Sequence, residues 1–253
     1  MSASLLMNFR EYYYNDSISF INDNIFLYDI RSCYYRILKN ILNIDIGQWK
    51  DKAERNIKIG LLFKENPDIQ KEVVKINKDS MINFIKENNL SDNDILFIER
   101  DGLAIKKYVG KQKFDDRIWP EFREHYKITI RSLDKKNSYI LLNNDKAILK
   151  GAKYKTVGIE RYLYETIHKL LSMNYENMFK KMNKLRLEYF NNDDIDLFKI
   201  PVKEGYKILL KNNQTLTIRD EHNLNFKNLP IDKYVYYKEH VEGFIKSMIY
   251  ELR

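Results

Sequence analysis

The apolar residues of this 253-residue chain change their spacing from one segment to the next, and this alternation constrains the fold more than any other feature. Residues 25–30 form a short β-like run, and residues 31–44 continue with apolar side chains at helical spacing. Residues 50–63 and 68–89 also have helical patterns, which Pro67 separates. The first third of the chain therefore predicts one strand followed by three helical segments.

The rest of the chain continues this mixture of strands and helices. Residues 95–98 and 103–105 are predicted to form a hairpin, because Asp101-Gly102 between them is a turn signal. Short strands are also expected within 126–157 and 206–219, and helices over 158–190 and from about 233 to 251. This order of elements is typical of the α+β class.

Basic residues outnumber acidic ones. The chain has 44 Lys and Arg against 36 Asp and Glu, which gives a net charge of +8 at pH 7. This balance favours an anionic partner, with nucleic acid first and a membrane surface second, although a soluble basic protein without either partner fits as well. The bias towards Asn, Ile, Lys and Tyr is what an AT-rich genome encodes, and it is compatible with a phage or other viral source.

Cysteine use and the lack of long apolar runs point to a compartment. The single cysteine, Cys33, excludes a disulfide framework and a Cys-rich zinc site, and it fits a reducing compartment. The N-terminal apolar run is too short for a signal peptide, and no stretch approaches the ~18 apolar residues of a membrane-spanning helix. We therefore expect a cytoplasmic protein that is neither secreted nor bound to a membrane.

Several common enzyme motifs are absent from the sequence. With only eight glycines, the chain has neither a P-loop nor a Rossmann fingerprint. No nucleophile elbow of the GxSxG type occurs. The four histidines are scattered and do not have the spacing of metal ligands.

Two local patterns carry candidate chemistry, and each also has a simpler structural explanation. Asp29 ends the first predicted strand just before a helix, where backbone N–H groups favour phosphate; the simpler role is a helix cap. Lys52, Asn56 and Gly60 stand four residues apart and share one helix face. That face could meet a triphosphate and a base pair, or it could be an ordinary solvated surface.

A third pattern lies in the predicted hairpin. Glu99 and Asp101 stand two residues apart, so in a strand they point to the same face. With Asp29 they could hold two divalent metals, which stabilise the attacking and leaving oxygens of phosphoryl transfer. The simpler explanation is a polar hairpin tip that uses Asp-Gly for its backbone geometry.

In residue type and in order, these three patterns resemble the three sequence motifs of family-B DNA polymerases. Asp29-Ile-Arg-Ser-Cys-Tyr34 resembles the first motif, DxxSLYP. Lys52, Asn56 and Gly60 resemble the second, KxxxNSxYG. Residues 98–101, Ile-Glu-Arg-Asp, resemble the third, the GDTD hairpin.

Weaker similarities follow in the second half of the chain. Lys150-Gly151 with Arg161 is similar to the KG…R segment beyond the palm of these polymerases. Residues 135–139 resemble the basic-Tyr motif, and residues 232–237 resemble the end of the thumb. The resemblance therefore runs from about residue 25 to the C-terminus.

The resemblance implies a template-directed DNA polymerase that transfers dNMP to a primer 3′-OH with two Mg²⁺ ions. Asp29 and Asp101 would hold the metals with the help of the Ile30 carbonyl. Glu99 would take the place of the first hairpin aspartate. Tyr34 matches the residue that lies under the sugar and excludes a 2′-hydroxyl, which favours dNTPs over rNTPs.

The resemblance also implies where the nucleotide and the primer–template DNA bind. Lys52 would meet the triphosphate, and Asn56 and Gly60 would flank the nascent base pair. The basic helices of 158–190 would follow the DNA backbone, since Lys and Arg contacts supply most of the affinity. The remaining DNA contacts expected from the motifs are Lys150, Gly151 and Arg161.

The implied architecture is a palm, with an antiparallel sheet and packed helices, followed by a mostly helical thumb. The palm would cover 25–157, with reduced fingers at about 31–63, and the thumb 158–253. Residues 1–24 would form an N-terminal extension, and a candidate domain boundary without a clear linker lies between 115 and 125.

The chain also departs from the family pattern. Tyr35 replaces the Pro of the first motif, and Ile57 and Ile59 replace the Ser and Tyr of the second. Lys52 follows Asp29 by only 23 positions, so the fingers would be a stub. We therefore expect a minimal or split polymerase without an exonuclease domain. Either the missing parts lie on another polymerase or replication subunit, or the protein no longer carries out processive synthesis.

Two other hypotheses stay open. The first is a non-catalytic polymerase-like subunit that binds DNA or a replication partner, which the stub fingers favour. The second is a basic nucleic-acid-binding protein of another fold, which predicts that Asp29 and Asp101 lie far apart. A two-metal nuclease is a variant of the enzyme hypothesis and ranks below it, because Tyr34 has no role in a nuclease.

Overall fold

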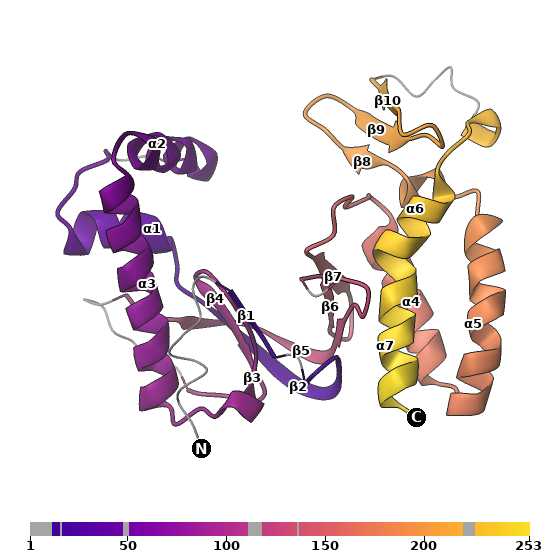
Figure 1. Cartoon of the computed structure of the whole chain (residues 1–253), viewed down its shortest axis with the longest axis horizontal. Coiled ribbons are helices and arrows are strands. Elements are labelled where there is room, and N and C mark those ends of the chain that lie inside the picture. The colour runs from indigo at the N-terminus through magenta and orange to yellow at the C-terminus, as the bar shows by residue number, and fades with distance from the viewer. Residues whose placement is uncertain (1–11, 16, 48–50, 111–117, 136, 220–225) are drawn as a thin grey trace. The chain divides into compact units, whose positions relative to one another are not determined.

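The computed structural model describes residues 12–15, 17–47, 51–110, 118–135, 137–219 and 226–253 (Figure 1). The chain forms two compact units. Unit 1 consists of residues 1–16 and 24–125, and unit 2 consists of residues 17–23 and 126–253. Helices and antiparallel strands occur in both units, so the expected α+β class is confirmed.

Antiparallel strands organise unit 1. The strands β1 (Tyr12–Tyr14), β3 (Ile95–Glu99), β4 (Gly102–Ile105) and β2 (Phe20–Asp29, from Asn24 in this unit) pair in that order. The predicted hairpin is therefore confirmed as β3 and β4, and β2 is longer than the predicted run. The strand β1 was not predicted, because three tyrosines in a row show no alternation.

The three helical segments that the sequence predicted are present among the described residues of unit 1. A short α1 (Cys33–Arg36) continues as a π-helical segment over Ile37–Ile41, and α2 (Lys52–Glu65) and α3 (Pro67–Glu87) follow. The Asp51 side chain caps α2 by accepting hydrogen bonds from two backbone N–H groups of its first turn. Pro67 begins α3, where a missing N–H costs nothing.

The core of unit 1 lies between the strands and these helices. Its apolar side chains come from both strands of the hairpin and from the inward faces of α1, α2 and α3. Fully buried members include Ile30, Ile37, Val73, Met81, Ile98 and Leu103. Ile30 after β2 and Ile98 and Leu103 in the hairpin thereby anchor the ends of these strands in the core of unit 1.

Unit 2 combines a short antiparallel sheet with a group of helices. Its first sheet contains the end of β5 (Glu121–Arg131), β6 (Tyr139–Leu142) and β7 (Ala147–Lys150). A second sheet contains β8 (Ile200–Pro201), β9 (Tyr206–Leu209) and β10 (Thr215–Ile218). The predicted helical region 158–190 is two helices, α4 (Ile159–Leu171) and α5 (Tyr175–Phe190).

The C-terminal helix of unit 2 is continuous but changes its winding. The segments are α6 (Lys233–Tyr237), a π-helical stretch over Lys238–Glu242 and α7 (Gly243–Glu251). The segment α7 packs beside α5 in Figure 1. The core around them is aromatic, with Tyr189, Phe198 and Tyr236 fully buried.

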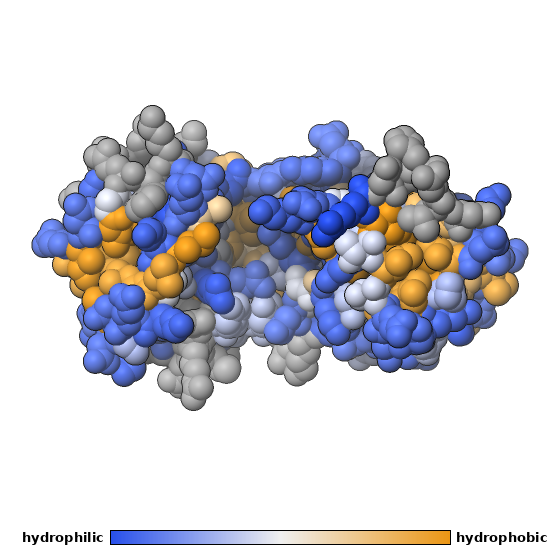
Figure 2. All heavy atoms as spheres, turned by 90° about the horizontal axis from the view of Figure 1, so that it is seen from above, coloured by the Kyte–Doolittle hydropathy of each residue, from blue (hydrophilic) through white to orange (hydrophobic). Residues whose placement is uncertain are grey.

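The face drawn in Figure 2 is mostly hydrophilic, with hydrophobic patches between the hydrophilic residues. Within unit 1, α2 leaves Ile57 and Leu61 exposed, at 62% and 48% of their area. Among the residues that the structure describes, no helix is both long enough and apolar enough to cross a bilayer. The expected extension 1–24, the boundary 115–125 and the basic-Tyr segment 135–139 each lie partly outside the described residues.

Candidate functional site

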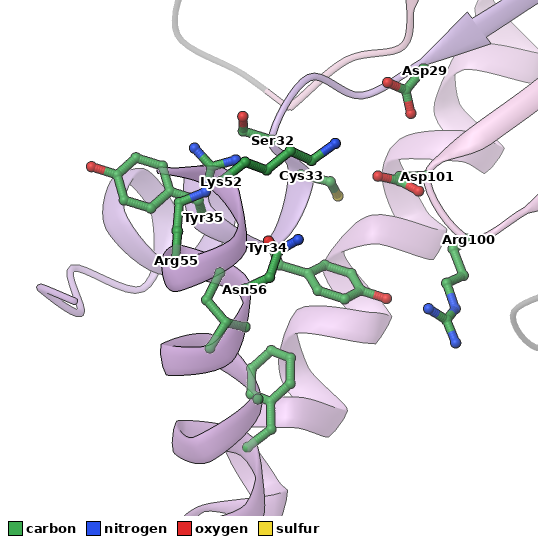
Figure 3. Close-up of a pocket in the computed structure, with 13 residues that line it drawn as sticks. Asp29, Ser32, Cys33, Tyr34, Tyr35, Lys52, Arg55, Asn56, Arg100 and Asp101 are labelled. Carbon is green, nitrogen blue, oxygen red and sulfur yellow. The ribbon is translucent and has the colours of Figure 1, made fainter. Parts of the chain in front are cut away.

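A pocket of about 520 Å³ opens in unit 1, and side chains from three separate stretches of the chain line it (Figure 3). One stretch is the end of β2 with α1, the second is α2, and the third is the hairpin turn between β3 and β4. Its lining residues are Asp29, Ser32, Cys33, Tyr34, Tyr35, Lys52, Arg55, Asn56, Ile59, Gly60, Phe63, Arg100 and Asp101.

Six of the residues singled out in the sequence meet in this pocket. They are Asp29, Tyr34, Lys52, Asn56, Gly60 and Asp101. The hypothesis that the motif matches are accidental predicted that the two aspartates lie far apart, and this prediction is wrong. Each of the three patterns thus contributes at least one residue to the same pocket, although Asp29 and Asp101 stand 72 positions apart in the sequence.

Strand pairing places the two aspartates side by side. Asp29 lies opposite Gly102 in the β2–β4 ladder, and the Ile30 backbone N–H donates a hydrogen bond of 2.9 Å to the Asp101 carbonyl. Asp29 and Asp101 then project into the same space in Figure 3. The turn needs Arg100 at a φ of 49°, a left-handed conformation that is uncommon for a residue with a side chain.

The electrostatics of the two carboxyl groups reflect this closeness. Burial raises the pKa of Asp29, and the neighbouring Asp101 raises it further, while Arg123 and Lys52 act in the opposite direction. Burial also raises the pKa of Asp101, against the influence of Arg100, Lys52 and Arg123. Two half-buried carboxyl groups thus share a site that nearby cations partly neutralise.

Cations outnumber acids on the pocket wall. Lys52, Arg55 and Arg100 face two aspartates. The Arg55 guanidinium lies over the Tyr35 ring, 5.3 Å from its centroid, and the Arg100 Nε donates a hydrogen bond of 2.7 Å to the Tyr12 hydroxyl. Such a wall favours a ligand that carries several negative charges.

The apolar side of the pocket is equally defined. The Tyr34 ring packs against Phe63 of α2, with centroids 5.8 Å apart. Gly60 lies inside the same helix, where a glycine costs roughly 1 kcal/mol relative to alanine. A Cβ at Gly60 would meet no atom of the chain within 4 Å, so internal packing does not require a glycine there.

Asn77 of α3 holds the site together, and the sequence reasoning missed it. Its side chain is buried, its Nδ2 donates a hydrogen bond of 2.9 Å to the Arg100 carbonyl, and its Oδ1 accepts one of 3.2 Å from the Cys33 Sγ. One amide therefore connects the hairpin turn to the start of α1. Its signal was a polar residue at helical spacing between the buried Val73 and Met81.

Arg123 of β5 is a second residue that was missed. Its Nη2 lies 3.2 Å from the Asp29 Oδ2. The stretch around it, Glu121 to His125, has Phe122 as its one apolar residue, and it therefore gave no strand signal.

The other predicted site residues lie outside the pocket. The Glu99 carboxylate accepts a hydrogen bond of 2.6 Å from the Tyr14 hydroxyl, and Ile30 is buried in the core of unit 1. In unit 2, the Arg161 guanidinium pairs with Asp194 at 2.8 Å, and Lys150 is exposed at the end of β7. A Cβ at Gly151 would overlap the Asn137 carbonyl, so the chain's own packing requires that glycine.

The donor set of the pocket suits Mg²⁺. Within the described ranges, no cluster of three or more His, Cys, Asp and Glu side chains has the arrangement of a metal site. Mg²⁺ needs less than that, because it keeps several of its waters and takes one or two carboxylates with phosphate oxygens. The paired Asp29 and Asp101 meet that requirement. No protein-family model and no curated protein matches the chain.

Proposed function

We propose that the pocket of unit 1 is the active site of a template-directed DNA polymerase, which transfers dNMP to a primer 3′-OH with the help of two Mg²⁺ ions. The observation that carries the proposal is the convergence of Asp29, Tyr34, Lys52, Asn56, Gly60 and Asp101 on one pocket. The sequence motifs selected these residues without knowledge of their positions in space.

The two carboxylates have the role of metal ligands in this proposal. Asp29 and Asp101 would hold the Mg²⁺ ions, with the Ile30 carbonyl assisting. Bound Mg²⁺ supplies Lewis-acid stabilisation of the attacking and leaving oxygens. The buried Asn77 amide and the strand pairing keep the two carboxyl groups in position for this purpose.

The cations and the glycine have the role of nucleotide ligands. Lys52 lines the pocket and influences both carboxyl groups, so its ammonium group lies where a triphosphate would approach the metals. Arg55, one turn further along α2, would add a second phosphate contact. Gly60 leaves open space that packing does not explain, which suits the close approach of a base pair beside Asn56.

Tyr34 has the role of a sugar platform by resemblance, which would favour dNTPs over rNTPs. Its ring is held against Phe63 in the pocket. Primer–template DNA would contact the basic surface of unit 2, including Lys150, Gly151 and Arg161. The stub fingers imply another polymerase or replication subunit as a further partner.

Primer extension tests the proposal. Wild type is compared with Asp101→Asn, which keeps the side-chain size, and with Asp68→Asn, which removes a fully exposed carboxylate of α3. We expect Mg²⁺-dependent extension that falls by about 10³-fold or more in Asp101→Asn and by less than twofold in Asp68→Asn. Extension that survives the Asp101 substitution would contradict the proposed active site.

A non-catalytic polymerase-like subunit is the second candidate, and the ion pair between Arg123 and Asp29 favours it. In such a protein the guanidinium would permanently replace the metal. This candidate predicts salt-sensitive binding of primer–template DNA and no extension by wild type, with or without added partner subunits.

A further inference from the structure

The Arg123 guanidinium forms an ion pair with one carboxylate oxygen of Asp29, which is a proposed metal ligand. Its Nη2 lies 3.2 Å from the Asp29 Oδ2, which is the distance of a direct ion pair. Arg123 comes from β5, which belongs neither to the three motifs nor to the pocket wall. The pair is thus separate from the residues that the resemblance selected.

The influence of Arg123 extends to the second carboxylate. Burial raises the pKa of both aspartates, and Arg123 lowers the pKa of Asp101 as well as that of Asp29. The guanidinium therefore lies in the field of both acids and compensates part of the repulsion between them. A divalent cation at the same carboxylates would perform the same compensation with twice the charge.

The ion pair is exposed enough to be reversible. The Arg123 and Asp29 side chains retain 35% and 37% of their accessible area. Ion pairs of this kind contribute little net stability, because water and salt compete with them. A ligand with higher charge can therefore replace the guanidinium without disturbing the core of unit 1.

We propose that Arg123 is a resident counter-ion of the Asp29–Asp101 pair, which a divalent cation displaces from Asp29 when it binds. The competition sets the metal concentration at which the site fills. Without metal, the guanidinium keeps the two carboxylates together and partly neutralised. The inference rests on the proposed function in one respect, since it takes this pair as the metal site.

Direct Mn²⁺ binding to the full chain, without nucleotide or DNA, tests this role. Calorimetry or the electron paramagnetic resonance signal of free Mn²⁺ gives the dissociation constant at fixed ionic strength. The variant is Arg123→Gln, and the matched control is Lys71→Gln, which removes the same charge from an exposed side chain of α3. The Asp101→Asn variant identifies which binding belongs to the pair.

We expect Asp101-dependent Mn²⁺ binding that is about fivefold or more tighter in Arg123→Gln, because a positive charge and a competing donor are both removed. Lys71→Gln should change the constant by less than 1.5-fold, as estimated for a screened remote charge. Arg123→Lys, which keeps the charge but loses the planar fork, should lie between wild type and Arg123→Gln. This second variant decides the question if Arg123→Gln does not fold.

The outcomes separate the two proposals. Asp101-dependent binding that is equally tight or weaker in both Arg123 variants overturns the counter-ion role and leaves the metal site standing. Absence of Asp101-dependent binding in wild type and in the Arg123 variants overturns the metal centre of the proposed function, and the counter-ion role with it. Binding that appears only after Arg123 is replaced supports the counter-ion role most strongly.

Discussion

The two units of the chain use their polar groups in opposite ways. In unit 1, two carboxyl groups with raised pKa values share a pocket with three cations. One of these cations, Arg100, has a left-handed backbone conformation. In unit 2, the largest buried side chains are aromatic, and Arg161 is paired at the surface. The contrast teaches that unit 1 gathers charged groups around a pocket, whereas unit 2 keeps Arg161 at its surface and fills its core with aromatic rings.

Two buried polar side chains, Asn77 of unit 1 and His240 of unit 2, differ in their surroundings. In unit 1 the Asn77 amide makes hydrogen bonds at both ends to the site. In unit 2 the His240 ring is fully buried beside Tyr236, and burial together with Lys135 lowers its pKa to about 3. The first group organises a pocket, and the second makes its unit sensitive to acid.

Substitution of one cation in each unit sharpens the comparison most. Lys52→Ala should raise the KM for dNTP by about 10- to 100-fold, which corresponds to one lost charge-assisted contact. Arg161→Ala should leave that KM unchanged, weaken DNA binding by about tenfold or less and reduce its salt dependence. Steady-state extension kinetics measure the KM for dNTP, and DNA titrations at several salt concentrations measure DNA binding. A raised KM for dNTP in Arg161→Ala would contradict the assignment of nucleotide binding to unit 1 alone.

Asn77 tests how strongly unit 1 is organised around its site. Asn77→Leu should lower the unfolding free energy by about 1–3 kcal/mol, because the Arg100 carbonyl loses a donor in a partly buried hydrogen bond. Ser80→Ala on the same helix removes only a bond from the Ser80 hydroxyl to the Ile76 carbonyl, and should cost less than about 0.5 kcal/mol. Equal losses in urea unfolding would show that Asn77 has no special role.

His240 tests unit 2 by pH. The folded state keeps the ring neutral down to about pH 3, whereas the unfolded state takes up a proton near pH 6.5. The unfolded state therefore binds more protons between these values, and stability is lost as the pH falls below about 6.5. Relative to His240→Phe, wild type should lose up to about 1.4 kcal/mol per pH unit in urea unfolding between pH 6 and 4; parallel pH profiles would contradict the buried neutral ring.

The smallest expected effect is that of Asp101→Asn on stability. This substitution should stabilise the protein although it should abolish activity. Because its pKa is raised in the folded state, ionisation above the ordinary value near 4 lowers stability as the pH rises. Asp101→Asn should therefore raise the melting temperature by about 1–4 °C at pH 7, and the gain should vanish near pH 3. A lower melting temperature at pH 7 would mean that unit 1 is not destabilised by its site.

The sequence predicted the elements of the fold better than their details. The hairpin followed from Asp101-Gly102, and α3 followed from Pro67 and its apolar spacing. The break between α4 and α5 was missed although Asn174 caps α5 by accepting a hydrogen bond from the Asn177 N–H. The π-helical stretches had no signal, because a wider turn depends on tertiary packing.

The candidate site divides along the same line. Residues that belong to short motifs, such as Asp29 and Lys52, were found because their spacing along the chain is fixed. Arg123 was not found, because it reaches Asp29 from a different strand and only the folded sheet brings the two together. Asn77 could be predicted only in part. The sequence shows a polar residue among the apolar residues of one helix face, but it does not show that this residue contacts the Arg100 carbonyl.

The most direct test of the account is the position of a bound metal and nucleotide. Crystals of the full chain grown or soaked with Mn²⁺ and a dNTP give the metal position from anomalous scattering. We predict a Mn²⁺ peak between the carboxylates of Asp29 and Asp101, with the triphosphate beside Lys52. Metal and nucleotide bound only on unit 2, or an empty pocket at saturating concentrations of both, would contradict the assignment of the active site to unit 1.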